Sequence, residues 1–204
     1  MRTLIIGDIH GCYDELISLI KLFSPKKGDK IYTVGDIIGK GPSVKKVIET
    51  LIELKIDSVL GNHEYWFLKK GKEYDPLSFL HKSPYIDYLK SMKPYLDKEN
   101  FFLVHAGINP YKGIYKSDIT EYTNIRNIDY GDGKTPWFKL YNGKKIIIFG
   151  HWAKQGLVNR SNVKGLDSGC VYGKSLTGYI VEEDSFISIK SKKCYSPIIP
   201  KPES

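Results

Sequence analysis

The sequence predicts an α/β fold in which strands and helices alternate and neighbouring strands of the sheet run parallel. Two observations favour this fold. Short apolar runs of strand length recur along the chain, and the segments between the first of them place apolar residues at helical spacing. At 204 residues, of which 41% are hydrophobic, the chain can bury a sizeable core as one domain, which we expect to span residues 1–204.

The first part of the chain carries the alternation. Residues 3–7 (TLIIG) are a short, β-branched and apolar run, so we expect a buried strand there. Residues 13–23 (YDELISLIKLF) have the apolar stripe of an amphipathic helix, and residues 43–54 (SVKKVIETLIEL) have another. The runs at 31–34 (IYTV) and 58–60 (SVL) are the second and third strands, which completes a β-α-β-α-β unit.

The middle of the chain interrupts this pattern. Residues 65–100 are rich in Tyr and Lys and are broken by three prolines, so we expect a helical insertion with loops beside the sheet. Two more buried strands are expected at 101–104 (FFLV) and 146–149 (IIIF). Between them, residues 111–142 contain many Tyr, Asn and Gly residues with little periodicity, which predicts a long surface excursion.

The last part of the chain predicts a hairpin and a tail. Residues 175–190 (SLTGYIVEEDSFISIK) have two strand-forming runs around a turn at EEDS. Residues 191–204 end in a Pro-rich stretch, for which we expect a loose or extended tail.

Composition narrows the class of protein. The net charge of +8 is spread over scattered lysines, which is typical of a solvated surface and also favours encounter with an anionic substrate. Three widely spaced cysteines argue against a disulfide framework and a structural zinc site, so we expect reduced thiols in a cytoplasmic protein. Apolar stretches stay shorter than a membrane span, and because the first predicted strand begins almost at Met1, we expect no signal peptide.

The strand ends carry the chemistry. Each of five apolar runs is followed by a polar side chain, and a histidine lies two residues beyond the first; the six are Asp8, His10, Asp36, Asn62, His105 and His151. Because open α/β sheets place their sites outside the carboxyl ends of the strands, we expect these side chains to converge. Two carboxylates, one amide and three imidazoles suit first-row divalent metals, and six ligands suit two ions about 3.5–4 Å apart with a bridging carboxylate.

The motifs around these residues have a recognisable order. GDIHG, GDIIGKGP, GNHE, HAG and GHW resemble the ordered signature of the calcineurin-like metallophosphoesterases, in particular of the phosphoprotein phosphatase superfamily. The resemblance spans residues 7–152. It implies a β-sandwich of two mixed sheets flanked by helices, with a dinuclear metal site at the strand ends.

The resemblance also implies a role for each matching residue. One metal would be held by Asp8, His10 and Asp36, and the other by Asp36, Asn62, His105 and His151. His63 of GNHE matches the proton donor to the leaving group, and the groups facing phosphate would be Lys40, Asn62 and Arg126. The family resemblance favours Mn in vitro, while the donor set also accepts Fe, Zn, Co or Ni.

Gly39 departs from the phosphatase pattern. The protein phosphatases have Asp at this position, and it pairs with the GNHE histidine, so His63 would lack that carboxylate. Phosphoanhydride cleavage needs less acid help, because its leaving group departs easily. We expect Gly39→Asp to favour substrates whose leaving group needs a proton, unless Gly39 has a positive φ, in which case all activities would fall together.

Three functions are consistent with these features. The segments FGHWA and GLDSGCVYGKSLTGY resemble the symmetrical diadenosine-tetraphosphatases, which favours nucleotide phosphoanhydrides as substrates, although that branch is longer and usually has GNHD. A serine/threonine or dual-specificity phosphoprotein phosphatase is the alternative enzyme. An inactive nucleotide- or RNA-binding module is the alternative of another class, and nucleic acid would otherwise enter only as capped or triphosphorylated RNA.

Overall fold

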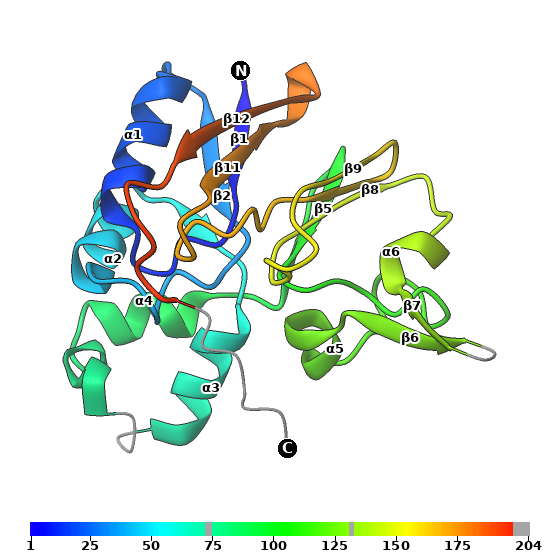
Figure 1. Ribbon diagram of the computed structural model, residues 1–204, viewed down its shortest axis with the longest axis horizontal. Coiled ribbons are helices and arrows are strands. Elements are labelled where there is room, and N and C mark those ends of the chain that lie inside the picture. Colours follow the sequence, from blue (N-terminus) through cyan, green and yellow to red (C-terminus); the bar gives the residue numbers. More distant parts are fainter. Residues whose placement is uncertain (72–74, 131–132, 198–204) are drawn as a thin grey trace.

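The computed structural model describes residues 1–71, 75–130 and 133–197, and it confirms two mixed sheets flanked by helices (Figure 1). The first sheet has the order β12-β11-β1-β2-β3. Its strands are β1 (Thr3–Ile6), β2 (Lys30–Thr33), β3 (Asp57–Ser58), β11 (Ser175–Ile180) and β12 (Ser185–Lys190). β1, β2 and β3 run parallel, as the predicted β-α-β-α-β unit requires. β11 and β12 form the predicted antiparallel hairpin, joined by a 3-10 turn at Val181–Glu183, and β11 also pairs with β1.

The second sheet has the order β4-β5-β8-β10-β9. Its strands are β4 (Tyr95–Asp97), β5 (Phe101–Val104), β8 (Ile146–Phe149), β9 (Val158–Arg160) and β10 (Val163–Gly165). The central strands β5, β8 and β10 run parallel. Of these strands the sequence predicted only β5 and β8, because the other three have three residues each and are too short to show a pattern.

Helices flank the two sheets. They are α1 (Tyr13–Phe23), α2 (Val44–Glu53), α3 (Asn62–Lys70), α4 (Tyr85–Ser91), α5 (Ile119–Asn124), α6 (Trp137–Leu140) and a 3-10 helix at Asp75–His81. In Figure 1, α1 and α2 lie beside the first sheet, and α5 and α6 lie on the side of the second. Among the described residues, no helix is both long and apolar enough to cross a membrane.

The alternation of side chains along each strand produces these layers. On β1, Leu4 and Ile6 pack with the helices, whereas Ile5 between them packs against Leu103 of the second sheet. On β5, Phe102 joins the cluster on the outer face of the second sheet. The apolar core therefore has three parts, one on the outer face of each sheet and one between the two sheets. The carboxyl ends of the parallel strands remain free to carry a site.

Two predicted segments differ from the expectation. Residues 111–142 contain α5, α6 and a small hairpin, β6 (Asn127–Tyr130) and β7 (Gly133–Pro136), and they bury Trp137 under the second sheet. Sequence periodicity missed these elements because each is only four to six residues long. Of the predicted tail 191–204, residues 198–204 lie outside the described residues, while Tyr195 Oη donates a hydrogen bond to Glu15.

Candidate metal centre

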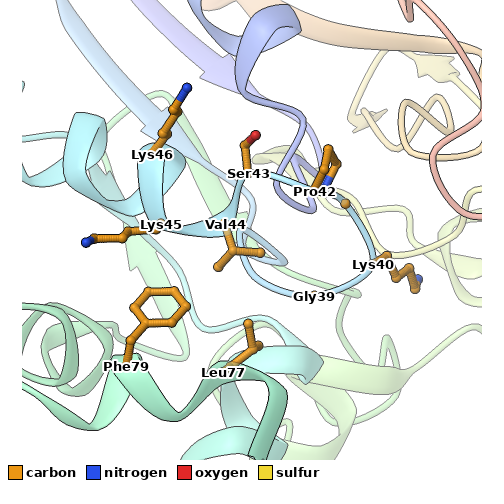
Figure 2. A pocket seen from close by; sticks show the side chains of 10 residues that line it. Gly39, Lys40, Pro42, Ser43, Val44, Lys45, Lys46, Leu77 and Phe79 are labelled. Carbon is orange, nitrogen blue, oxygen red and sulfur yellow. The ribbon is translucent and has the colours of Figure 1, made fainter.

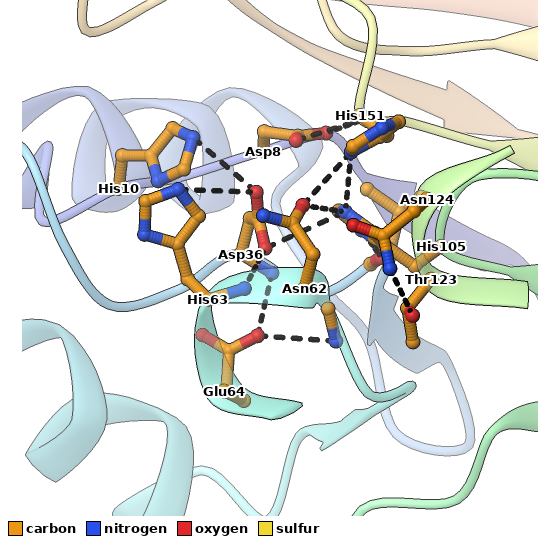
Figure 3. Close-up of polar contacts among 12 residues, drawn as sticks. Asp8, His10, Asp36, Asn62, His63, Glu64, His105, Thr123, Asn124 and His151 are labelled. Carbon is orange, nitrogen blue, oxygen red and sulfur yellow. Dashed lines mark hydrogen bonds and ion pairs between the residues drawn. The ribbon is translucent and has the colours of Figure 1, made fainter. Parts of the chain in front are cut away.

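The six strand-end side chains lie in one region of the structure (Figure 3). Asp8 and His10 follow β1, Asp36 follows β2, and Asn62 is the first residue of α3, just after β3. The second sheet contributes His105 after β5 and His151 after β8. The two sheets therefore supply different parts of the cluster.

Asp36 lies at the centre of this cluster. Its Oδ2 is 3.5 Å from His10 Nε2, and its Oδ1 is 3.4 Å from His105 Nε2. Ligand atoms fall into two groups, each within 4.8 Å: His10, Asp36 and His63 form one, and Asp36, His105 and His151 form the other. A carboxylate shared by two groups in this way is the arrangement that a bridging metal ligand needs.

Asn62 belongs with the second group. Its Oδ1 is 3.0 Å from His105 Nε2 and 2.8 Å from His151 Nδ1. The nitrogens of these two imidazoles are 3.2 Å apart. One amide oxygen and two imidazole nitrogens thus face a common point beside Asp36, which is a donor set that fits a first-row divalent cation.

Backbone carbonyls fix the imidazole orientations. His10 Nδ1 lies 3.1 Å from the Ile38 carbonyl oxygen, and His105 Nδ1 lies 2.7 Å from the Val34 carbonyl oxygen. With Nδ1 donating to a carbonyl, each ring presents an unprotonated Nε2 toward Asp36. This is the outer contact that commonly orients a metal-binding histidine.

Burial keeps the imidazoles neutral. It lowers the pKa of His10 to about 3 and that of His151 to about 2, and it also lowers the pKa of His105. Burial alone would raise the pKa of Asp36, but the imidazoles facing it hold that pKa below its usual value. At neutral pH the cluster therefore offers free nitrogen lone pairs and an ionised carboxylate, which are the protonation states that bind a cation.

The sequence predicts Asp8 as a metal ligand, and in the structure its carboxylate contacts the backbone of His151. Both of its oxygens accept the backbone N–H of His151, at 3.0 Å, and they lie outside the two ligand groups. Burial, together with Asp167 and Asp36, raises the pKa of Asp8 well above its usual value. In this arrangement Asp8 anchors the His151 backbone beside the cluster.

Asp167 is a carboxylate of the site for which the sequence assigned no role. It is buried, and burial raises its pKa to about 6. It follows β10, so it obeys the same rule of a polar residue after a strand end. The signal was present in GLDSGC, but the three-residue strand before it had not been predicted.

His63 is the outer member of the first group, and Lys40 lies beside that group. The edge of the His63 ring approaches His10, with centroids 4.8 Å apart, and its Nε2 is 4.0 Å from Asp36 Oδ2. Lys40 Nζ is 3.3 Å from His10 Nε2. Both side chains thus lie at the edge of the cluster, where His63 is half-buried and Lys40 is exposed.

Gly39 lies directly against His63. It has a φ of +86°, and a Cβ added there would come within 2.5 Å of His63 Nδ1. The glycine therefore makes room for the histidine in a backbone conformation that L-residues rarely adopt. Of the two outcomes considered for Gly39→Asp, this geometry favours the loss of all activities together.

Glu64 holds the two loops of the site together. Its Oε2 accepts the backbone N–H groups of Asp36 and Gly61, and its Oε1 accepts that of Ile38. The side chain is fully buried, and this burial, with Asp36 nearby, raises its pKa to about 8. The last residue of GNHE is thus a positioning residue for the Asp36 loop.

Arg126 lies on the side of the second group. It is exposed between α5 and β6, and its charge contributes to lowering the pKa of His105 and of His151. Within the described parts of the chain, its guanidinium makes no hydrogen bond or ion pair. It is near the site but is not brought into contact with it.

Comparisons with known proteins find similar sequences and structures over most of the chain. Residues 1–181 match the family described as calcineurin-like phosphoesterase. The symmetrical bis(5'-nucleosyl)-tetraphosphatase of Wigglesworthia glossinidia brevipalpis is 30% identical, over 94% of this chain and 100% of its own. The symmetrical bis(5'-nucleosyl)-tetraphosphatase of Psychromonas ingrahamii is also 30% identical, over 87% of this chain and 92% of its own. A crystal structure described as a candidate diadenosine tetraphosphatase is 32% identical, with a TM-score of 0.87 over 93% of both chains. A serine/threonine phosphatase from Saccharomyces cerevisiae shares the fold alone. It is 12% identical, with a TM-score of 0.57 over 100% of this chain and 82% of its own.

Proposed function

Since the chain belongs to the calcineurin-like phosphoesterase family and is a hydrolase, we propose that it cleaves dinucleoside tetraphosphates with two divalent metal ions. The observation that carries the metal requirement is Asp36, whose two oxygens face histidines of two ligand groups. The substrate class comes from the names of the relatives that match nearly the whole chain.

The donor set fits the metals. In this proposal His10 and Asp36, with Asp8 beside them, hold one ion, and Asp36, Asn62, His105 and His151 hold the other. Two such ions, when bound, supply Lewis-acid polarisation of a phosphoryl oxygen and activation of a water. Mn is the metal we propose for activity in vitro, and Fe, Zn, Co and Ni suit the same ligands.

The chain's own residues contribute charge and a proton. Lys40 lies 3.3 Å from His10 Nε2 and is positioned to neutralise a substrate phosphate. His63 is half-buried at the edge of the cluster and is the candidate proton donor to the leaving group. Arg126 is a second candidate phosphate contact, because its charge acts on His105 and His151.

The experiment compares two substrates at equal enzyme with added Mn. We expect a larger kcat/KM on diadenosine tetraphosphate than on a phosphoserine peptide. Symmetrical cleavage would yield ADP alone, which chromatography separates from the ATP and AMP of asymmetric cleavage. A larger kcat/KM on the peptide would overturn the substrate class while leaving the phosphohydrolase assignment in place.

A further inference from the structure

A cavity of about 560 Å³ lies beside the loop that begins at Gly39, and Figure 2 shows the side chains that line it. One wall is the loop from Gly39 to Ser43 together with the first turn of α2, and the other carries Leu77 and Phe79 of the 3-10 helix. Gly39 lies against His63, and Lys40 reaches His10, so the same loop borders both the cavity and the metal centre. A ligand bound at the centre would therefore have this cavity beside it.

The lining has two kinds of chemistry. Pro42, Val44, Leu77 and Phe79 are apolar, and the half-buried Phe79 ring offers a flat surface. Three lysines, Lys40, Lys45 and Lys46, are the charged residues among the described lining of the cavity, and the nearest carboxylate to Lys45 Nζ is that of Glu49, 3.9 Å away and outside the lining. An apolar wall beside cationic groups suits a ligand with a flat apolar end and an anionic end.

The start of α2 adds to the positive potential. Ser43 makes no side-chain capping hydrogen bond, and the first turn of this ten-residue helix has no acidic residue. Helix N-termini with free N–H groups attract anions, so the end of α2 supports the lysines at the same wall. A nucleoside linked to a polyphosphate has the required combination of a flat base and an anionic chain.

A second cavity is the competing location. It has a volume of about 370 Å³ and is lined by Asn62, His63, Trp66 and Lys70. The exposed Trp66 ring already has Lys69 Nζ over it, 5.4 Å from the ring centroid. A base stacking on that face of Trp66 would compete with this cation–π contact, whereas the Phe79 ring meets Tyr85 at an interplanar angle of 83°, with ring centroids 5.6 Å apart. This difference favours the larger of the two cavities.

From these features we infer that the cavity between Gly39 and Phe79 binds one nucleoside end of the substrate, with the base against Phe79 and the adjoining phosphates near Lys40 and Lys45. The inference rests on the proposed function, because it gives that substrate a binding site. It makes Phe79 a specificity-determining residue and assigns it no part in the reaction itself.

The test removes the ring and compares substrates with and without a base. For Phe79→Ala we expect the ratio of kcat/KM on diadenosine tetraphosphate to kcat/KM on inorganic tripolyphosphate to fall roughly 5- to 150-fold, the range for loss of a base–aromatic stack. Phe79→Leu keeps apolar volume and should show the same fall with an unchanged melting temperature, while Phe79→Tyr should restore the ratio. Trp66→Ala is the matched control in the competing cavity.

Three outcomes would overturn the inference. The ratio could stay unchanged in Phe79→Leu, or the fall could appear in Trp66→Ala instead. A larger loss on a phosphoserine peptide than on the dinucleotide would assign the cavity to a peptide side chain.

Calorimetric binding separates this inference from the proposed function. If the wild type does not cleave diadenosine tetraphosphate, the substrate proposal fails on its own. Weaker binding of ADP by Phe79→Leu, with pyrophosphate binding unchanged, would still support the cavity. Equal ADP affinity in both proteins would refute it.

Discussion

Replacing Gly39 by Ala should displace His63 and slow the reaction. A Cβ at this position would lie 2.5 Å from His63 Nδ1, whereas non-bonded contacts are favourable at about 3.5 Å or more. The imidazole, or the loop that carries Gly39, must therefore move by about 1 Å. A misplacement of this size can cost about 10²-fold in rate, so we expect kcat to fall by about this factor.

Gly113→Ala is the matched control. Gly113 has a φ of +85°, against +86° for Gly39, but a Cβ there would meet nothing within 4 Å. Both variants therefore carry the cost of an L-residue in a left-handed conformation, about 1–2 kcal/mol, and only Gly39→Ala adds the contact with His63. We expect similar losses of stability from the backbone in urea unfolding, and a loss of kcat confined to Gly39→Ala.

The choice of substrate sharpens this comparison. If His63 donates a proton to the leaving group, Gly39→Ala should lose more activity on an alkyl phosphate than on p-nitrophenyl phosphate, whose leaving group departs unaided. Steady-state kinetics with saturating Mn would measure both. A kcat for Gly39→Ala within about twofold of that for Gly113→Ala would refute the reasoning, because the position of His63 would then not matter.

Four further outcomes follow from the site. Asp36→Asn should weaken both metals, because its oxygens face both ligand groups, and elemental analysis after dialysis against Mn would measure the loss. His63→Ala should lower turnover while metal stoichiometry stays the same; loss of one metal would instead make His63 a ligand. Glu64→Ala should destabilise the protein by roughly 3 kcal/mol or more in urea unfolding, because three backbone N–H groups lose their acceptor. In the metal-free protein, His10 is protonated below its usual pKa of 6.5 when the chain is unfolded, but only near 3 when the chain is folded, so stability falls as pH decreases. Between pH 7 and 5 this group lowers the free energy of unfolding by about 2 kcal/mol, and His10→Asn should show a smaller drop in that free energy.

Sequence periodicity located the elements whose residues repeat often enough to form a pattern. The helix expected at 13–23 is observed at Tyr13–Phe23, and the hairpin at 175–190 has its turn where EEDS predicted it. The third strand was expected at 58–60 but is observed at Asp57–Ser58, since Val59 makes only an isolated bridge to Lys93. Strands of two or three residues are determined by their partners in the sheet, which a local pattern does not contain.

The candidate site was predictable by residue type but not by geometry. The rule of a polar residue after each strand end found Asp36, Asn62 and the histidines, and the structure brings them together. It could not show that Asp8 accepts the backbone N–H of His151, because that contact joins the ends of strands in two different sheets. The rule also missed Asp167, because the strand that precedes it, β10, has only three residues.

The division of the cluster between two sheets has a consequence for the metal binding that we propose. The first sheet supplies Asp36 and Asn62, and the second supplies His105 and His151, so neither sheet alone offers a complete second group. β11, the partner of β1 in the first sheet, is synthesised late because it lies near the end of the chain. In the proposed function, loading of the second group therefore depends on docking of the two sheets, whereas His10, Asp36 and His63 of the first group all follow strands of the first sheet. An ion bound in the second group would tie the two sheets together, by about 2.7 kcal/mol at a metal concentration one hundred times the Kd.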